Sequence, residues 1–206
     1  MRRLLILAAL LVVGAAVWWR KHPSACPYGQ RFWVQAPHPL ITRDRLRAVL
    51  APEDGERVLE IGPGTGFYTL DLAGWVGSGT IEIFDLQQEM LDHTMARAGE
   101  RGITNVVPTQ GDASQLPFAD ERFDAVVLIT VLGEIPDREA AMAEIARVLK
   151  PGGRLIVGEL FGDPHFTTPG ALGRLASDAG LGPMQRSGPW AGYYARLPKS
   201  TADQAD

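Results

Sequence analysis

Three closely spaced glycines follow an acidic residue in the stretch RVLEIGPGTGFYTL, which begins at Arg57. Gly62, Gly64 and Gly66 predict a turn with unusual backbone dihedrals, where a ligand can come close to bare backbone. The apolar run before the glycines predicts a buried strand, and a helical pattern resumes after them at Phe67. The free N–H groups at the start of that helix would face a ligand on the turn. Such turns also occur without ligands, but strand, glycine turn and helix together indicate a nucleotide site.

The spacing of the glycines distinguishes two kinds of nucleotide site. A dinucleotide-binding turn has glycines at its first, third and sixth positions, whereas the sixth position here is Phe67. The glycines stand instead at the first, third and fifth positions, and Glu60 precedes the first of them by two residues. This pattern, EIGPGTG, resembles motif I of the class I S-adenosylmethionine-dependent methyltransferases. The resemblance implies that Glu60 orients the methionine amino group of S-adenosylmethionine and that the three glycines let the methionine moiety approach closely.

A second acidic residue ends the next predicted strand. Asp85 follows the largely apolar run 80–84 and stands nineteen residues beyond Gly66. A carboxylate at that point can accept hydrogen bonds from both hydroxyls of a ribose. Asp85 could also cap the predicted helix 87–98, and the two roles are compatible.

A third acidic residue, Asp112, follows the predicted strand 103–109. The resemblance implies that the Asp112 side chain binds the adenine amino group and that the backbone N–H of Ala113 binds the ring nitrogen. Leu86 and Thr130 complete the predicted cofactor site. Two longer phrases, LPFADERFDAVVLI and LKPGGRLIVGE, resemble the same family at its fourth and fifth strands.

Methyl transfer from a sulfonium is a direct displacement, so the protein contributes alignment and exclusion of water, and a base only if the acceptor must lose a proton. Glu134 and His165 are the predicted proton acceptors. Because ligands of open α/β sheets bind beyond the carboxyl ends of the strands, the acceptor is expected near residues 130–134, Asp163 and His165, and near the aromatic pair Tyr193 and Tyr194. Relatives resembling ubiquinone and menaquinone methyltransferases carry histidines before the Pro-Asp pair, where this chain has Gly133 and Glu134.

The order of the predicted elements indicates an α/β fold. A helix begins at Thr42, and a closing hairpin over 183–187 and 192–197 ends the domain. The resemblance implies a Rossmann-like, doubly wound, seven-stranded and mostly parallel sheet over residues 42–200, with a polar tail at 201–206. A hydrophobic helix is expected to precede this domain.

That helix is predicted over residues 1–21, because residues 4–19 carry no charge and end in two tryptophans. The run is slightly shorter than the roughly 20 residues of an ordinary spanning helix. A cleaved signal peptide is the alternative. We expect an uncleaved single-pass membrane anchor, joined by a linker over 22–41, with the catalytic domain facing the cytoplasm, where the methyl donor is made.

Composition narrows the function further. Up to Leu50 the chain has eight basic residues and one acidic residue, and the remainder has twelve basic and 23 acidic residues. Such an acidic domain is unsuited to nucleic acid. The single cysteine excludes an internal disulfide, and the scattered histidines form no metal-binding pattern.

These observations predict an S-adenosylmethionine-dependent methyltransferase with a small-molecule acceptor, and the N-terminal segment favours a lipophilic one. Two alternatives remain open at this point. One is a cofactor-binding or scaffolding protein of the same fold without turnover. The other is a dinucleotide-dependent oxidoreductase.

Overall fold

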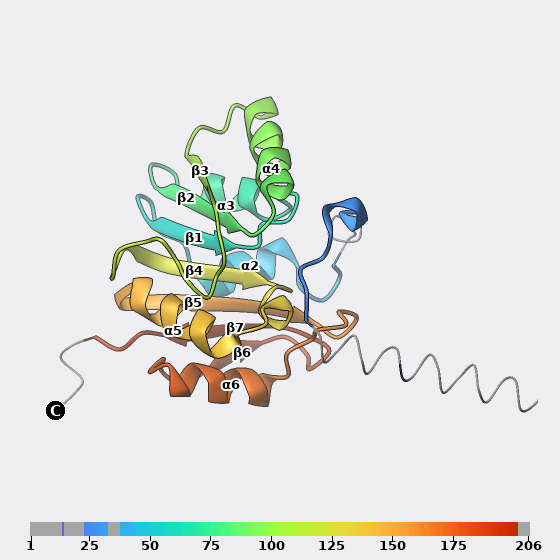
Figure 1. Cartoon of the computed structure of the whole chain (residues 1–206). Coiled ribbons are helices and arrows are strands. Elements are labelled where there is room, and N and C mark those ends of the chain that lie inside the picture. The colour runs from blue at the N-terminus through green and yellow to red at the C-terminus, as the bar shows by residue number, and fades with distance from the viewer. Residues whose placement is uncertain (1–13, 15–22, 33–37, 202–206) are drawn as a thin grey trace, which may run out of the picture.

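One seven-stranded sheet forms the centre of the computed structural model, which describes residues 14, 23–32 and 38–201. The strands lie in the order β3-β2-β1-β4-β5-β7-β6 (Figure 1). The pairs β1·β2, β2·β3, β1·β4 and β4·β5 are parallel, whereas β7 pairs antiparallel with β5 and β6. The predicted seven-stranded, mostly parallel sheet is confirmed. The strand order reverses between β1 and β4, which is the place where such sheets bind ligands.

The element bounds agree with the predicted order. The strands are β1 Arg57–Ile61, β2 Thr80–Asp85, β3 Val106–Gln110, β4 Phe123–Ile129, β5 Leu149–Leu160, β6 Gln185–Ser187 and β7 Gly192–Pro198. The helices are α2 Arg43–Leu50, α3 Thr69–Trp75, α4 Gln88–Glu100, α5 Arg138–Val148 and α6 Pro169–Asp178, with 3₁₀ turns η1 Tyr28–Gln30 and η2 Leu132–Glu134.

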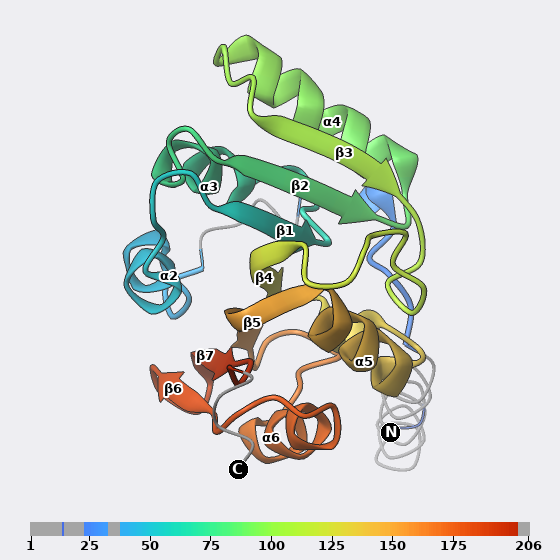
Figure 2. The same ribbon diagram turned by 90° about the vertical axis from the view of Figure 1, so that its left-hand side faces the viewer.

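Helices cover both faces of the sheet (Figure 2). Along β4, Ala125 and Val127 pack with α2 and α3, while Val126 and Leu128 pack with α5 and α6. This alternation follows from the two-residue period of a strand, and burial on both faces explains why β4 is apolar throughout.

Side-chain caps fix three of the helix starts. Thr42 Oγ1 accepts from the N–H of Arg45, and Asp137 Oδ1 accepts from the N–H of Ala140 at 2.9 Å. Thr168 caps α6 in the same way. Each of these caps satisfies an N–H that the first helical turn leaves without a partner.

The predicted anchor over 1–21 lies outside the described residues apart from Gly14. Within the part of the chain that the structure describes, none of the helices is long and apolar enough to cross a membrane. The linker is described at 23–32 and 38–41, and it packs on the domain (Figure 1, blue).

Candidate active site

A cavity of about 920 Å³ lies beyond the carboxyl ends of the parallel strands. Its walls come from the segments that follow β1, β2, β3, β4 and β5, and from residues 23–30 of the linker. The volume is that of an ordinary small-molecule site. Five loops and the linker thus converge on one space at the reversal of the strand order.

The glycine turn after β1 forms one wall of the cavity. Gly62 and Gly64 line it with left-handed φ values of +68° and +56°. A Cβ atom at Gly62 would collide with the side chain of Val131. Gly66 also has a left-handed φ, but it lies outside the lining, and a Cβ there would come within 2.8 Å of Thr94 on α4. The bare backbone at Gly66 therefore allows close packing of α4, and only the first two glycines face the cavity.

Asp85 lines the same cavity at the end of β2 and is 9 % exposed. Its Oδ1 accepts a hydrogen bond from the N–H of Gln87 at 2.8 Å. Burial raises the pKa of Asp85 to about 6, although backbone hydrogen bonds from Gln87, Leu86 and Gly64 oppose the rise. The carboxylate is thus held by the start of α4 and by the glycine turn together, so the cap role and the ligand role are compatible. Leu86 beside it also lines the cavity and is largely exposed.

Glu60 lies near Asp85 but outside the cavity lining. The Thr69 hydroxyl donates to its Oε2 at 2.5 Å. Burial raises the pKa of Glu60 to about 7, against that hydrogen bond, and the charge of Asp85 adds to the rise. Its role toward the methionine amino group stays a prediction.

Asp112 and Ala113 line the cavity after β3. Asp112 Oδ1 accepts from the backbone N–H and the hydroxyl of Ser114, at 2.9 and 2.8 Å. The turn packs tightly on Phe84 of β2, because a Cβ at Gly111 would come within 2.6 Å of that ring. Asp112 lines the same cavity as Asp85, and its role toward adenine stays a prediction.

The far end of the cavity begins where β4 ends. Thr130 adopts a left-handed φ of +56°, and its N–H donates to Gly158 O at 2.8 Å. This conformation is strained for a residue other than glycine, and such strain often occurs at functional sites. It turns the chain into η2 and directs it toward the cavity, which both Thr130 and Glu134 line.

Glu134 is a second acid of the cavity lining whose pKa is raised. The backbone N–H of Cys26 donates to its Oε2 at 3.2 Å. Burial raises the pKa of Glu134 to about 8; the Cys26 hydrogen bond opposes the rise, and the charges of Asp163 and Asp85 add to it. A group with this pKa can exchange a proton near neutral pH.

His165 lines the same end of the cavity and is buried. Its backbone N–H donates to Asp163 Oδ1 at 2.6 Å. A Cβ at Gly133 would collide with the backbone of His165. The loop after β5 thus fills the space that a side chain at position 133 would need, which explains why glycine stands there.

Comparisons with known proteins agree with this geometry. Residues 58–153 match the model of a family described as "Methyltransferase domain". A ubiquinone/menaquinone biosynthesis C-methyltransferase UbiE of Cellvibrio japonicus is 42 % identical over 113 residues, which are 54 % of this chain and 45 % of that protein. A demethylmenaquinone methyltransferase of Corynebacterium glutamicum is 42 % identical over 130 residues, which are 63 % of this chain and 50 % of that protein.

A solved SAM-dependent methyltransferase from Aquifex aeolicus has a TM-score of 0.76 at 20 % identity, covering 85 % of this chain and 100 % of that one. Residues 58–153, just under half of the chain, thus match a methyltransferase domain, and the fold is that of an S-adenosylmethionine-dependent methyltransferase. Its cofactor is S-adenosylmethionine. The chain spans about half the length of the curated relatives. The [4+2]-cyclase SpnF shares the fold with a TM-score of 0.67 at 22 % identity, covering 78 % of this chain and 80 % of that one.

The predicted place of Tyr193 and Tyr194 in the methyltransferase site is wrong. Both residues are fully buried, and neither lines the cavity. The Tyr193 hydroxyl donates to Thr167 O at 2.7 Å, and the Tyr194 hydroxyl donates to Ile41 O at 3.1 Å. Because consecutive residues of β7 point to opposite faces of the sheet, the two rings enter the two core layers instead.

The linker contributes a wall of the methyltransferase cavity that the sequence pattern did not locate. We call residues 23–32 the strap. Gln87 holds it twice, since its Nε2 donates to Cys26 O at 2.9 Å and its Oε1 accepts from the N–H of Tyr28 at 3.0 Å. The Tyr28 hydroxyl also contacts His93 Nδ1 at 3.2 Å. The strap thus packs on the domain through Gln87 and His93.

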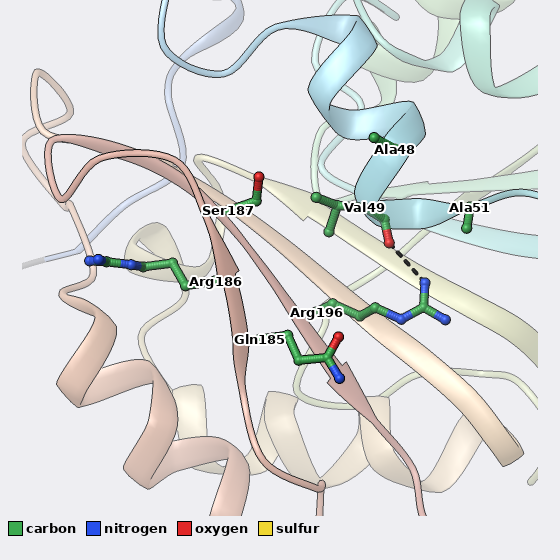
Figure 3. A pocket seen from close by; sticks show the side chains of 7 residues that line it. All are labelled: Ala48, Val49, Ala51, Gln185, Arg186, Ser187 and Arg196. Atoms are coloured by element: carbon green, nitrogen blue, oxygen red, sulfur yellow. Dashed lines mark hydrogen bonds between the residues drawn. The ribbon is translucent and has the colours of Figure 1, made fainter.

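A second, shallower pocket of about 420 Å³ lies between α2 and the β6–β7 hairpin (Figure 3). Arg196 Nη1 donates to Val49 O at 2.8 Å across it. None of the predicted site residues lines this pocket, whereas Asp85, Asp112 and Glu134 line the larger cavity.

Proposed function

We propose that this protein is an enzyme that transfers the methyl group of S-adenosylmethionine to a small, lipophilic acceptor bound beside Glu134. One observation carries the proposal: the predicted cofactor acids Asp85 and Asp112 and the proton-exchanging acid Glu134 line a single cavity. Cofactor and acceptor can therefore meet without a rearrangement of domains. Catalysis by alignment requires this arrangement.

The cofactor supplies an electrophilic methyl group when bound. In the proposed site, Asp85 accepts hydrogen bonds from the ribose hydroxyls, and Asp112 and the Ala113 N–H bind the adenine edge. The bare backbone at Gly62 and Gly64 would let the methionine moiety approach closely, and the missing Cβ at Gly62 also lets Val131 pack against the turn. The ionised carboxylates among the acidic side chains of the lining also favour a cationic sulfonium over an uncharged analogue.

Glu134 is the proposed proton acceptor. With a pKa of about 8 it is ionised in about one molecule in ten at pH 7 and in about half at pH 8. The Glu134 carboxylate would take the proton of an acceptor O–H, and S-adenosylmethionine, when bound, would supply the methyl group to the acceptor oxygen. His165 is the second candidate for this proton transfer, since it lines the same end of the cavity.

The lining favours an uncharged acceptor. It contains Asp85, Asp112, Glu134 and Asp163 but neither lysine nor arginine among the described residues, so a phosphate or carboxylate on the acceptor would lack a counterion. Apolar side chains line the same end, among them Ile129, Val131, Ile135 and Leu160. Together with the names of the quinone methyltransferases above, this supports a phenol or hydroquinone that carries an apolar substituent.

The uncharged run 4–19 supports attachment to a membrane. We propose that residues 1–21 hold the domain at the cytoplasmic face of a bilayer, where a lipophilic acceptor would be concentrated.

Labelled methyl donor tests the function. The purified chain is incubated with a panel of four acceptors: a long-chain alkyl hydroquinone, its tail-free parent, an alkylamine and an alkyl carboxylate. The expected result is label in the hydroquinones and none in the carboxylate. Binding of the donor without turnover on any acceptor would support the scaffolding alternative, and binding of NADH in its place would support the oxidoreductase.

A further inference from the structure

Two large aromatic side chains are exposed side by side next to the active-site cavity. Phe161 is 59 % exposed and Trp190 is 49 % exposed. Their ring centroids are 5.1 Å apart, and both rings contact the buried ring of Phe166, at 5.7 and 5.2 Å. Single exposed apolar residues are common, but a contiguous, firmly seated aromatic cluster marks an interaction surface.

The cluster belongs to the rim of the cavity. Phe161 stands between Leu160 and Gly162, which both line the cavity. The Phe161 N–H donates to Ala191 O at 2.9 Å and so joins the loop after β5 to the turn that carries Trp190. The aromatic pair is thus fixed to the cavity wall by backbone as well as by ring contacts.

Two other walls also expose apolar side chains. Leu86 lines the cavity after β2 and is 57 % exposed. Phe32 ends the strap, two residues after the lining residue Gln30, and is also 57 % exposed. We call Phe32, Leu86, Phe161 and Trp190 the apolar rim. It draws on four segments that are far apart in the sequence: the strap, the loop after β2, the loop after β5 and the turn between β6 and β7.

The sequence indicates what covers this rim. The uncharged run 4–19 ends four residues before Pro23, which lines the cavity. Four residues span at most about 14 Å. Any surface that receives the apolar run therefore lies within that distance of the cavity wall.

We propose that the apolar rim docks on a lipid bilayer and that the acceptor enters the cavity directly from the lipid. This inference rests on the proposed function, because it names the route of the lipophilic acceptor. Tryptophan and phenylalanine suit the water–lipid boundary, where a flat amphipathic ring can sit among the head groups. The acidic cavity then opens toward the lipid phase and selects uncharged molecules from it.

Lipid contact is tested without turnover, using the full chain in phosphatidylcholine vesicles with brominated acyl chains. Bromine quenches the fluorescence of nearby tryptophans. The proposal predicts that the Trp190→Phe variant loses a quenched component that the wild-type chain shows. An equal quenched signal in both proteins would overturn the proposal. So would a dimer in lipid-free buffer that dissociates in the same variant, since the rim would then be covered by a second copy.

The acceptor route is tested with the double variant Phe161→Ser, Trp190→Ser. The expected result is a KM about tenfold higher for the long-chain hydroquinone dissolved in vesicles, with no change for its soluble tail-free parent. The matched control is Val107→Ser, an exposed apolar residue on β3 away from the rim, which should change neither value. Unchanged affinity for S-adenosylmethionine shows that the double variant is folded.

An equal loss on both hydroquinones, or no loss on either, would overturn the proposed route. If neither hydroquinone is methylated by the wild-type chain, the proposed function fails, whereas the bromine experiment still decides whether the rim meets lipid.

Discussion

Replacing Asp85 with asparagine should weaken cofactor binding strongly. A hydrogen bond to a charged acceptor contributes about 1.5–3 kcal/mol, and the proposed site gives Asp85 two ribose hydroxyls to bind. Asparagine keeps one uncharged oxygen and presents an NH₂ group in place of the other. We therefore expect a loss of about 3 kcal/mol, which raises the Kd for S-adenosylmethionine about 100-fold.

The same substitution should stabilise the ligand-free fold. Burial raises the pKa of Asp85 from 3.8 to about 6, so its ionised form costs up to about 3 kcal/mol of stability. Because the pKa of Asp85 is raised on folding, this cost is absent below about pH 4. It grows between about pH 4 and pH 6 and is complete above pH 6. The free energy of unfolding of Asp85→Asn at pH 8 should therefore rise.

Titration calorimetry gives the Kd, and urea unfolding of the ligand-free protein gives the stability, both at pH 8. Asp92→Asn is the matched control, because Asp92 is exposed on α4 and bonds only to Gln88 among the hydrogen bonds found. It should change neither quantity. A Kd of Asp85→Asn within threefold of the wild-type value, or weak binding that follows from a less stable fold, would refute the reasoning.

Three further substitutions test other parts of the site. Gly62→Ala should lower the melting temperature and abolish cofactor binding in calorimetry, because the new Cβ meets Val131 at a left-handed φ; a variant that binds normally would contradict this. Glu134→Gln should lower kcat and remove the rise of kcat that follows an apparent pKa of about 8. Because burial favours protonated Glu134, the free energy of unfolding of the wild type should fall between pH 4.5 and 8, and that of the variant should fall less. An unchanged pH profile of kcat would exclude Glu134 as the proton acceptor. Thr69→Val should raise the pKa of Glu60 further by removing its 2.5 Å hydrogen bond, so that cofactor affinity at pH 7 falls several-fold and recovers at pH 9; equal affinities at both pH values would count against a charged Glu60.

Much of the site could be predicted from the sequence because its signals are local. The glycine turn, Asp85 and Asp112 each follow a predicted strand directly, and parallel strands bring their carboxyl ends to one edge of the sheet. The structure places Gly62, Asp85 and Asp112 at one cavity. The closing hairpin over 183–187 and 192–197 was likewise predicted, and β6 and β7 pair antiparallel there.

Other features depend on contacts between distant segments. Cys26 and Glu134 are 108 residues apart. No local sequence pattern therefore shows that the strap binds the Glu134 carboxylate or that the pKa of Glu134 is raised. Gly133 is glycine because the backbone of His165 packs against it. Tyr193 and Tyr194 were wrongly assigned to the site because both faces of β7 are covered, so their rings enter the two core layers.

A crystal structure with S-adenosylhomocysteine bound to the full chain would test the central claim most directly. The account predicts the ribose hydroxyls within hydrogen-bonding distance of Asp85, the adenine edge at Asp112 and Ala113, and the sulfur facing the end of the cavity that Glu134 lines. A nucleoside bound elsewhere, or one bound in this cavity with its sulfur turned away from Glu134, would contradict it.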